Sequence, residues 1–149
     1  LPEALSRRGL FPAGRLDKYS EGMMVLTDDG NFAHRLLSPN RHVPKTYYVE
    51  VDQPVVTPQL VLRFREGVFL GDGEHASPAH LEMLSSTSAN VTIFEGLYHQ
   101  VRRMFDHNGA HVTRLVRIRM GNLDLDPMLA AGQCRLLTEM ERTQLLGPF

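Results

Sequence analysis

Residues 14–30 read GRLDKYSEGMMVLTDDG, and their order decides how the first part of the chain folds. The carboxylate of Asp17 stands between a basic residue and a turn. The apolar run Met23–Leu26 follows, and the turn sequence Thr27–Gly30 closes the segment. This order predicts a strand over Met23–Thr27 that presents Asp17 on the loop before it. A carboxylate held there is suited to act as a nucleophile or a base. It is also suited to cap a turn, because Asp side chains hydrogen-bond their own backbone, and the segment alone favours that role.

Outward from this segment, strand and helix patterns follow one another without regular alternation. The β-branched and aromatic residues from Thr46 onward predict a strand, whereas Thr57 followed by Pro58 is a typical helix start. Two strand patterns flank the small polar segment Ser85–Ala89, as in a hairpin. The predicted strands are Thr46–Val51, Val68–Leu70, Ala79–Leu84, Asn90–Glu95 and His111–Met120, and the predicted helices are Asn31–Leu37, Thr57–Glu66, Gln100–His107 and a final helix from Thr138. This mixture predicts an α+β fold with a mixed, largely antiparallel central sheet flanked by helices.

The bulk composition fits one domain with balanced charge. The chain has 149 residues, with 16 Lys and Arg against 17 Asp and Glu, which excludes a domain that is basic as a whole. Positive charge is nevertheless concentrated locally, because five arginines lie between Gly96 and Met120 with Asp106 as the only acidic residue. A basic face for an anionic partner and an ordinary solvated surface are equally compatible with this stretch.

The sequence lacks the motifs of the common cofactor and metal sites. It has one cysteine, Cys134, so no disulfide can form within it, and its seven histidines have no metal-ligand spacing. No Walker phosphate loop, dinucleotide fingerprint or nucleophile elbow occurs. We therefore expect either an enzyme that uses no cofactor or metal, or a binding module. The single cysteine and the lack of an apolar run long enough to span a bilayer predict a cytoplasmic protein without membrane association.

Three residues from separate segments supply complementary chemistry. Asp17 offers a carboxylate, Tyr47 an aromatic face with a polar tip, and Arg102 a positive charge at the start of a helix. An arginine beside a carboxylate keeps it ionised, and a stacked aromatic ring holds a planar group. Brought together, these groups suit attack on, or proton removal from, a flat heterocycle.

The segment around Asp17 is followed by further blocks in a fixed order. They are Lys45–Tyr47, Glu95–Phe105, Leu115–Arg117 leading to Met120 and Gly121, and Ala131–Thr138. In these residues the chain resembles the RsuA-type ribosomal RNA pseudouridine synthases over nearly its whole length. The resemblance implies the pseudouridine synthase fold with an active-site cleft. It also implies an isomerase that converts a uridine in RNA to pseudouridine without metal or organic cofactor: the C1′–N1 bond breaks, the uracil rotates, and C5 joins the sugar.

The resemblance assigns roles to individual residues. Asp17 matches the catalytic aspartate, which acts on the ribose as nucleophile or base. Tyr47 matches the tyrosine that stacks on the target base and accepts the C5 proton. Arg102 matches the basic residue that pairs with the aspartate, and Arg103 is the other candidate for that pairing. Arg15 fills the gap that the extruded base leaves in the helix stack.

Further residues are expected to bind the substrate, because the target base must be flipped out of its stack. Arg103, Lys45, His99 and Gln100 are the predicted substrate-binding residues. Together with Arg41, the basic residues are expected to hold phosphates, with an attraction that weakens as salt increases. Bases splayed from RNA loops are the usual sequence-specific target.

The RNA target is predicted from one short block. Tyr98 and His99 resemble the small-subunit members, whereas large-subunit members more often have Asn-Arg there. We therefore predict a monomeric pseudouridine synthase for small-subunit (16S) ribosomal RNA, with that RNA or its assembly intermediate as partner. The alternatives are a large-subunit enzyme of the same family and a catalytically silent RNA-binding or ribosome-assembly module. Residues 1–149 are expected to form the catalytic domain, without the S4-type RNA-binding domain that many members carry before it.

Overall fold

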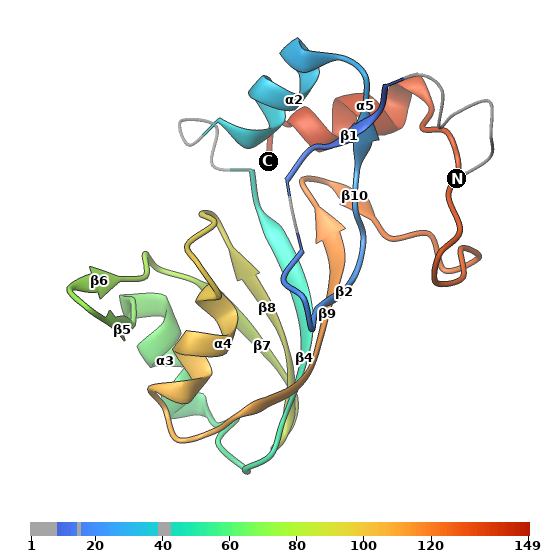
Figure 1. Ribbon diagram of the computed structural model, residues 1–149. Coiled ribbons are helices and arrows are strands. Elements are labelled where there is room, and N and C mark those ends of the chain that lie inside the picture. Colours follow the sequence, from blue (N-terminus) through green and yellow to red (C-terminus); the bar gives the residue numbers. More distant parts are fainter. Residues whose placement is uncertain (1–8, 15, 39–42) are drawn as a thin grey trace.

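The computed structural model describes residues 9–14, 16–38 and 43–149 of the chain. The strands of its central sheet are β2 (Glu21–Gly22), β4 (Lys45–Val51), β7 (His80–Ser85), β8 (Ser88–Ile93), β9 (Val112–Met120) and β10 (Leu123–Asp124). Their order is β10-β9-β4-β8-β7, with β2 also beside β9 (Figure 1). All neighbours are antiparallel except β2 and β9, which run parallel. The predicted α+β fold with a mixed, largely antiparallel sheet is confirmed.

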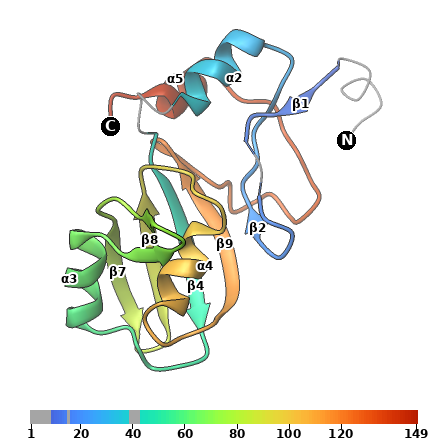
Figure 2. The same ribbon diagram turned by 60° about the vertical axis from the view of Figure 1, so that its left-hand side comes forward.

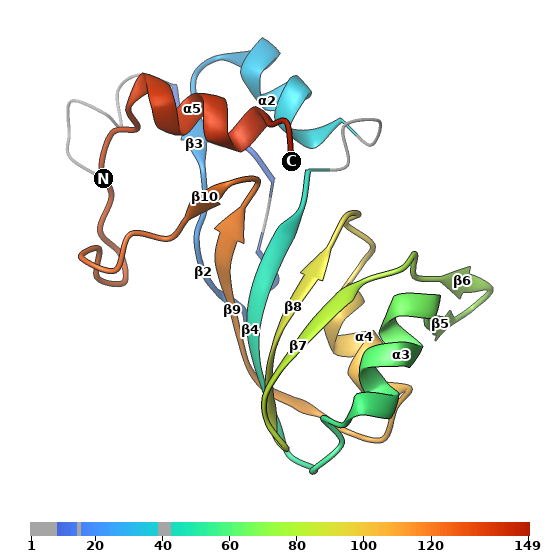
Figure 3. The same cartoon turned by 180° about the vertical axis from the view of Figure 1, so that it is seen from behind.

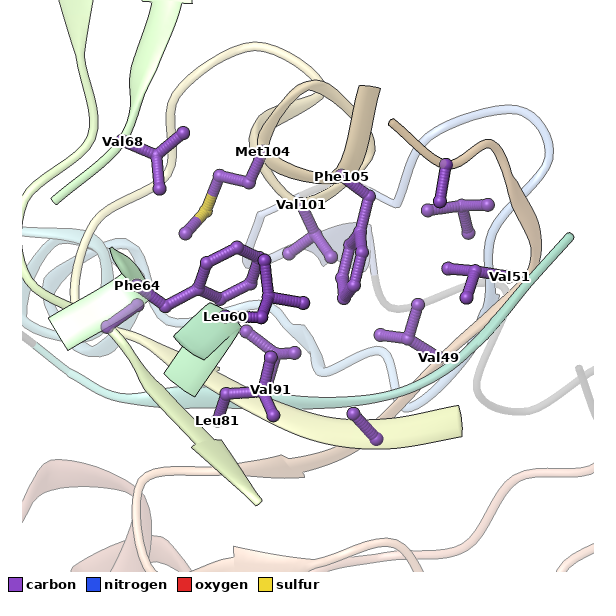
Figure 4. Packing of buried hydrophobic residues seen from close by; sticks show 14 of the residues in the cluster. Val49, Val51, Leu60, Phe64, Val68, Leu81, Val91, Val101, Met104 and Phe105 are labelled. Carbon is purple, nitrogen blue, oxygen red and sulfur yellow. The ribbon is translucent and has the colours of Figure 1, made fainter. Parts of the chain in front are cut away.

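Two helices cover one face of this sheet. They are α3 (Pro58–Glu66) and α4 (Gln100–Asp106), and the small hairpin of β5 (Phe69–Gly71) and β6 (Glu74–His75) lies beside them (Figures 1 and 3). Apolar side chains from both helices and from the sheet form the first core cluster. Within it the rings of Phe64 and Phe105 meet edge-on, with centroids 5.1 Å apart (Figure 4). Burial of these apolar groups is the main contribution that holds the helices on the sheet.

A second core cluster lies where β4 begins and β9 ends. Helices α2 (Gly30–Leu37) and α5 (Glu139–Leu146) pack on each other there (Figure 2), α2 contacts β3 (Leu26–Thr27), and α5 contacts β10. Strand β3 pairs only with β1 (Phe11–Pro12) among the described residues. Met120, the last residue of β9, is buried in this second cluster. Strand β9 therefore contributes to both clusters, with Val112 and Leu115 in the first and Met120 in the second.

The helix starts follow from local capping. The side chain of Thr57 accepts a hydrogen bond from Leu60 N at 3.3 Å, as the sequence predicted for the start of α3. Thr138 and Glu141 form a reciprocal capping box at the start of α5, and Asp29 accepts from two backbone N–H groups of α2. Each cap satisfies donors that have no partner within the helix. Within the described part of the chain, no helix is long and apolar enough to cross a membrane.

The predicted single strand Met23–Thr27 is wrong. Pairing occurs on both sides of the apolar run instead, because Glu21–Gly22 pair with β9 and Leu26–Thr27 pair with β1. Between them, Met23 and Val25 are buried in the second core cluster. The apolar run therefore carries the chain from one sheet to another, and its hydrophobicity reflects burial rather than continuous pairing.

Strand β9 contains two irregularities that the alternation in its sequence did not predict. Its register against β4 shifts twice, so that Thr113 and Ile118 are extra residues without a partner on β4. Each bulge changes which side chains face the core, because one inserted residue reverses the alternation. The buried residues of β9 are therefore Val112, Leu115, Arg117 and Met120.

Candidate active site

A cleft of about 800 Å³ opens between the two core clusters. Its apolar walls include Leu36 and Val43 of the second cluster and Ile93 and Leu115 of the first. Polar side chains converge on it from the loop before β2, from β4, from the segment before β7, from the residues between β8 and the start of α4, and from β9. They are Asp17, Ser20, Lys45, Tyr47, Ser77, Glu95, Tyr98, His99, Gln100 and Arg117. An apolar cleft of this size with converging polar groups is typical of a binding or active site.

Asp17 lies on a tight loop that is anchored to the central sheet. Its carbonyl accepts a hydrogen bond from Ser20 N at 2.9 Å, and the next two residues form β2 beside β9. Met23 N then donates to Arg117 O at 2.8 Å, and Arg117 Nε donates back to Met23 O, also at 2.8 Å. The loop is thus fixed by pairing only a few residues after Asp17, which restricts where the carboxylate can lie.

This anchoring requires glycine at position 22. Gly22 has a φ of 109°, a conformation that side chains with a Cβ rarely adopt. A Cβ at this position would lie 2.3 Å from Arg117 O and 2.5 Å from Arg117 N. Only glycine therefore allows β2 to lie this close to β9 without movement of the backbone.

The imidazole of His99 lies beside the carboxylate of Asp17. Its Nε2 lies 3.8 Å from Asp17 Oδ1. His99 has a φ of 46°, in the left-handed region, and its ring stacks on that of Tyr98 with centroids 3.9 Å apart and an interplanar angle of 15°. This uncommon backbone conformation is part of what brings the imidazole over the carboxylate.

A hydrogen-bond network holds the turn that carries His99. Glu95 Oε1 accepts from Gln100 Nε2 at 2.9 Å and from Ser77 N at 2.6 Å. Gln100 Oε1 in turn accepts from Leu97 N at 3.2 Å. Gln100 is buried, so satisfying its amide fixes its orientation. Gln100, predicted to bind substrate, thus also supports the turn from within.

Lys45 and Tyr47 face the cleft from the central strand β4. Both line it, as expected for residues two apart on a strand, which share a face. Tyr47 stands in register with Arg117 on β9 and with Val91 on β8. Burial, and secondarily the positive charge of Arg117, lowers the pKa of Lys45. The structure therefore brings Asp17, Tyr47 and Lys45 into one cleft from separate segments.

The ion pair expected between Arg102 and Asp17 is not formed. Arg102 Nη2 donates to Tyr19 O at 2.8 Å, and Nη1 donates to Val112 O at 3.4 Å. The physical reason is the loop geometry, which places the carbonyl of Tyr19 at Arg102 and the carboxylate of Asp17 near His99 instead. Arg102 therefore holds the Asp17 loop on α4 through the carbonyl of Tyr19, which lies two residues after Asp17.

Arg103 does not reach Asp17 either. Its guanidinium donates to Glu74 Oε1 at 2.9 Å, to Leu70 O at 3.1 Å and to Tyr98 O at 2.9 Å. It thereby ties the β5–β6 hairpin to the turn that carries Tyr98. The other predicted cations, Arg15 and Arg41, lie outside the described residues.

Sequence reasoning did not predict five polar residues of the cleft as site residues, and two of them, Arg117 and Glu95, have the strongest effect on its structure. Arg117 is only 2% exposed, and its Nη2 is buried without a hydrogen-bond partner among the described residues. It belonged to one of the quoted blocks, but its burial depends on the bulge at Ile118. Glu95 also belonged to a block, and the network that it organises depends on contacts with Ser77 that no spacing predicts.

Comparison with known proteins identifies the family. A family model described as RNA pseudouridylate synthase matches residues 1–107. The chain belongs to this family. The resemblance found in the sequence blocks is thus confirmed, and the cleft with Asp17 is the candidate active site of an RNA pseudouridylate synthase family member.

Two relatives and two solved structures place the chain within this family. The Escherichia coli (strain K12) protein named ribosomal small subunit pseudouridine synthase A is 44% identical over 133 residues, which cover 89% of this chain and 57% of that protein. The Bacillus subtilis (strain 168) protein named uncharacterized RNA pseudouridine synthase YtzG is 46% identical over 142 residues, which cover 93% of this chain and 59% of that protein. A crystal structure of a pseudouridylate synthase matches 97% of this chain and 63% of its own, at 40% identity and a TM-score of 0.92.

A chain in the crystal structure of the archaeal box H/ACA sRNP Nop10-Cbf5 complex shares the fold alone, at 18% identity and a TM-score of 0.54. The pseudouridine synthase fold is therefore confirmed. The chain spans less than two thirds of the length of the curated relatives that it matches.

Proposed function

We propose that this protein isomerises a uridine in small-subunit ribosomal RNA to pseudouridine. The observation that carries the proposal is that Asp17, Tyr47 and His99 line one and the same cleft. The choice of RNA is supported by the 44% identity to the Escherichia coli protein named for the small ribosomal subunit. We further propose that the chain acts as a monomeric catalytic domain in the cytoplasm.

The proposed chemistry divides between three residues. Asp17 acts on the ribose as nucleophile or base, which requires its ionised form. His99, 3.8 Å away, favours that form when it is protonated. Tyr47 stacks on the target base and accepts the proton from C5. Arg102 acts indirectly by holding the Asp17 loop through Tyr19 O, so it is a positioning residue.

Substrate binding is proposed to use the walls and rim of the cleft. Lys45 and Gln100 line the chamber that would receive the flipped nucleotide. Tyr98 is 74% exposed beside them, and its position depends on Arg103. Arg15 is proposed to fill the gap in the RNA stack. Cations around the rim would hold phosphates, so RNA affinity is expected to fall as salt increases.

The test of the catalytic proposal is neutralisation of Asp17 without a change of shape. Asp17→Asn is expected to abolish tritium release from [5-³H]uridine-labelled ribosomal RNA while the thermal unfolding curve stays unchanged. The matched control is Asp72→Asn, because Asp72 is exposed on the β5–β6 turn with a φ of 52° that asparagine adopts readily. Release by Asp17→Asn at the rate of the control would refute the proposal.

The alternative functions are separated by mapping pseudouridine in ribosomal RNA from cells with and without the gene. Loss of one small-subunit site, restored by the wild type but not by Asp17→Asn, is the expected result. Loss of a large-subunit site would assign the protein to the other ribosomal RNA. Tight RNA binding with no pseudouridine lost would identify a catalytically silent module.

A further inference from the structure

The floor of the cleft carries two cations that the proposed roles leave without a chemical task. Arg117 reaches it from β9 and Lys45 from β4. Arg117 donates its Nε to Met23 O, yet its Nη2 is buried without a partner among the described residues. The ammonium group of Lys45 likewise forms no ion pair or hydrogen bond with another side chain among the described residues. A buried, unused donor on a guanidinium is uncommon enough to require an explanation.

The carboxylates of the cleft do not neutralise these cations. Asp17 Oδ1 lies 3.8 Å from His99 Nε2, and Glu95 accepts from Ser77 and Gln100. Among the described residues neither carboxylate forms an ion pair with Lys45 or Arg117. Burial first, and then the positive charge of Arg117, lowers the pKa of Lys45, so the two cations lie close enough for Arg117 to disfavour the charge of Lys45. An arrangement that concentrates uncompensated positive charge in a partly buried floor is suited to an anion.

We propose that Lys45 and Arg117 stabilise the uracil anion that forms when the glycosidic bond of the target uridine breaks. This inference rests on the proposed function. When the C1′–N1 bond breaks, its electron pair leaves with N1, and the resulting charge is shared with the O2 and O4 oxygens. The charge persists until C5 bonds to C1′, which consumes it; C5 then loses its proton and N1 takes one up, which completes pseudouridine. The two cations supply preorganised donors where this charge develops.

The depth of the two residues favours the base over a phosphate as the anionic group. Arg117 is 2% exposed, and apolar side chains of both core clusters surround this floor. A flat uracil ring can enter such a chamber, whereas a phosphate remains in the RNA backbone and carries tightly bound water. The neutral ring gains little from the cations before the bond breaks, and the anion gains much. This difference between ground state and transition state is what accelerates a reaction.

The proposal is tested with Lys45→Met, which keeps the length of the side chain and removes its charge. Two ribosomal RNA transcripts serve as substrates, one with uridine and one with 5-fluorouridine. Fluorine stabilises the departing anion, so the fluorinated base needs less help from the protein. The single-turnover formation of the C–C-linked nucleoside is measured by nuclease digestion, chromatography and mass spectrometry, and the RNA Kd by filter binding.

The expected result is a decrease in the single-turnover rate whose size depends on the leaving group. Lys45→Met should lower the single-turnover rate on the uridine RNA by about 100-fold and lower the rate on the 5-fluorouridine RNA much less. The Kd for RNA should stay nearly unchanged. Arg117→Lys, which keeps the charge but lacks Nη2, should show a smaller loss with the same dependence. Arg65→Met, an exposed cation of α3 outside the cleft, should react like the wild type with both RNAs.

Three results would overturn the inference. An equal decrease in the rate on both RNAs would show that Lys45 does not stabilise the departing charge. A weaker Kd with an unchanged saturated rate would identify a phosphate contact instead. A wild-type protein that forms no C–C-linked nucleoside from either RNA would refute the proposed function itself, and the inference with it. The first two results leave the proposed function intact, so the two failures are distinguishable.

Discussion

Replacement of Gly22 by alanine tests whether the Asp17 loop depends on the pairing of β2 with β9. The new Cβ would lie 2.3 Å from Arg117 O, and the backbone φ of 109° is unfavourable for alanine. Neither problem is relieved by rotating a side chain, because the atoms in contact belong to the backbone. The strand must therefore move away from β9.

The cost can be worked from the contacts that are lost. A residue other than glycine in such a conformation costs about 1 to 3 kcal/mol. The two hydrogen bonds between Met23 and Arg117 contribute about 1 kcal/mol each. The sum is about 3 to 5 kcal/mol, which corresponds to a decrease in Tm of about 10 °C for a chain of this length.

The assay is thermal unfolding followed by circular dichroism, combined with tritium release. Gly22→Ala is expected to lower Tm by this amount and to lower kcat, because the loop that carries Asp17 is no longer fixed. The matched control is Gly30→Ala, because a Cβ at Gly30 meets nothing within 4 Å. Gly22→Ala with the Tm and kcat of the control would refute the anchoring argument.

The remaining predictions concern one positioning residue and two ionisable side chains. Arg102→Met removes the hydrogen bond to Tyr19 O, so kcat should fall by about 10- to 100-fold with little change in RNA Kd; an unchanged kcat would contradict the positioning role. The hydrogen bond from Arg135 lowers the pKa of Glu141 to about 2, so the carboxylate stabilises the fold above its ordinary pKa of 4.5 and loses this effect as the pH falls toward 2. The Tm difference between wild type and Glu141→Gln should shrink over that range, and a constant difference would disprove the linkage. Burial lowers the pKa of Lys45, so Lys45→Met should raise Tm at neutral pH, and the gain should shrink as the pH rises toward the ordinary lysine pKa of 10.5; a lower Tm would contradict this.

Features that depend on neighbouring residues were predictable from the sequence. The cap at Thr57 and the box that begins at Thr138 involve contacts three residues apart, so their residue types suffice to predict them. The hairpin of β7 and β8 was also predicted, although its turn is shorter than expected because β8 already begins at Ser88. The resemblance led to Asp17 and Tyr47, and the structure brings both into one cleft.

Features that depend on the tertiary register were not predictable. The split of Met23–Thr27 arises because the second core cluster buries the middle of that run. The partners of Arg102 are backbone carbonyls, and a carbonyl has no signature in sequence. The burial of Arg117 follows from a bulge on β9, which a regular alternation pattern cannot indicate. In each case the missing information is the position of a distant segment.

Several energetically unfavourable features of this fold lie around the proposed reaction. Gly22 and His99 both have positive φ, and Lys45 and Arg117 hold positive charge in a partly buried floor. Apolar residues at the two charged positions would extend the surrounding core clusters and remove the cost of burying a charge. Folding stability therefore gives no reason for the Lys45 charge or for the unpartnered Nη2 of Arg117, although the Nε of Arg117 does anchor Met23. An anion that exists only during the reaction does give a reason. Lys45→Met is expected to raise Tm and to lower the reaction rate mainly on the uridine RNA, whose base is the poorer leaving group. If both results are found, they have one cause: the positive charge of Lys45, which destabilises the folded chain and stabilises the transition state.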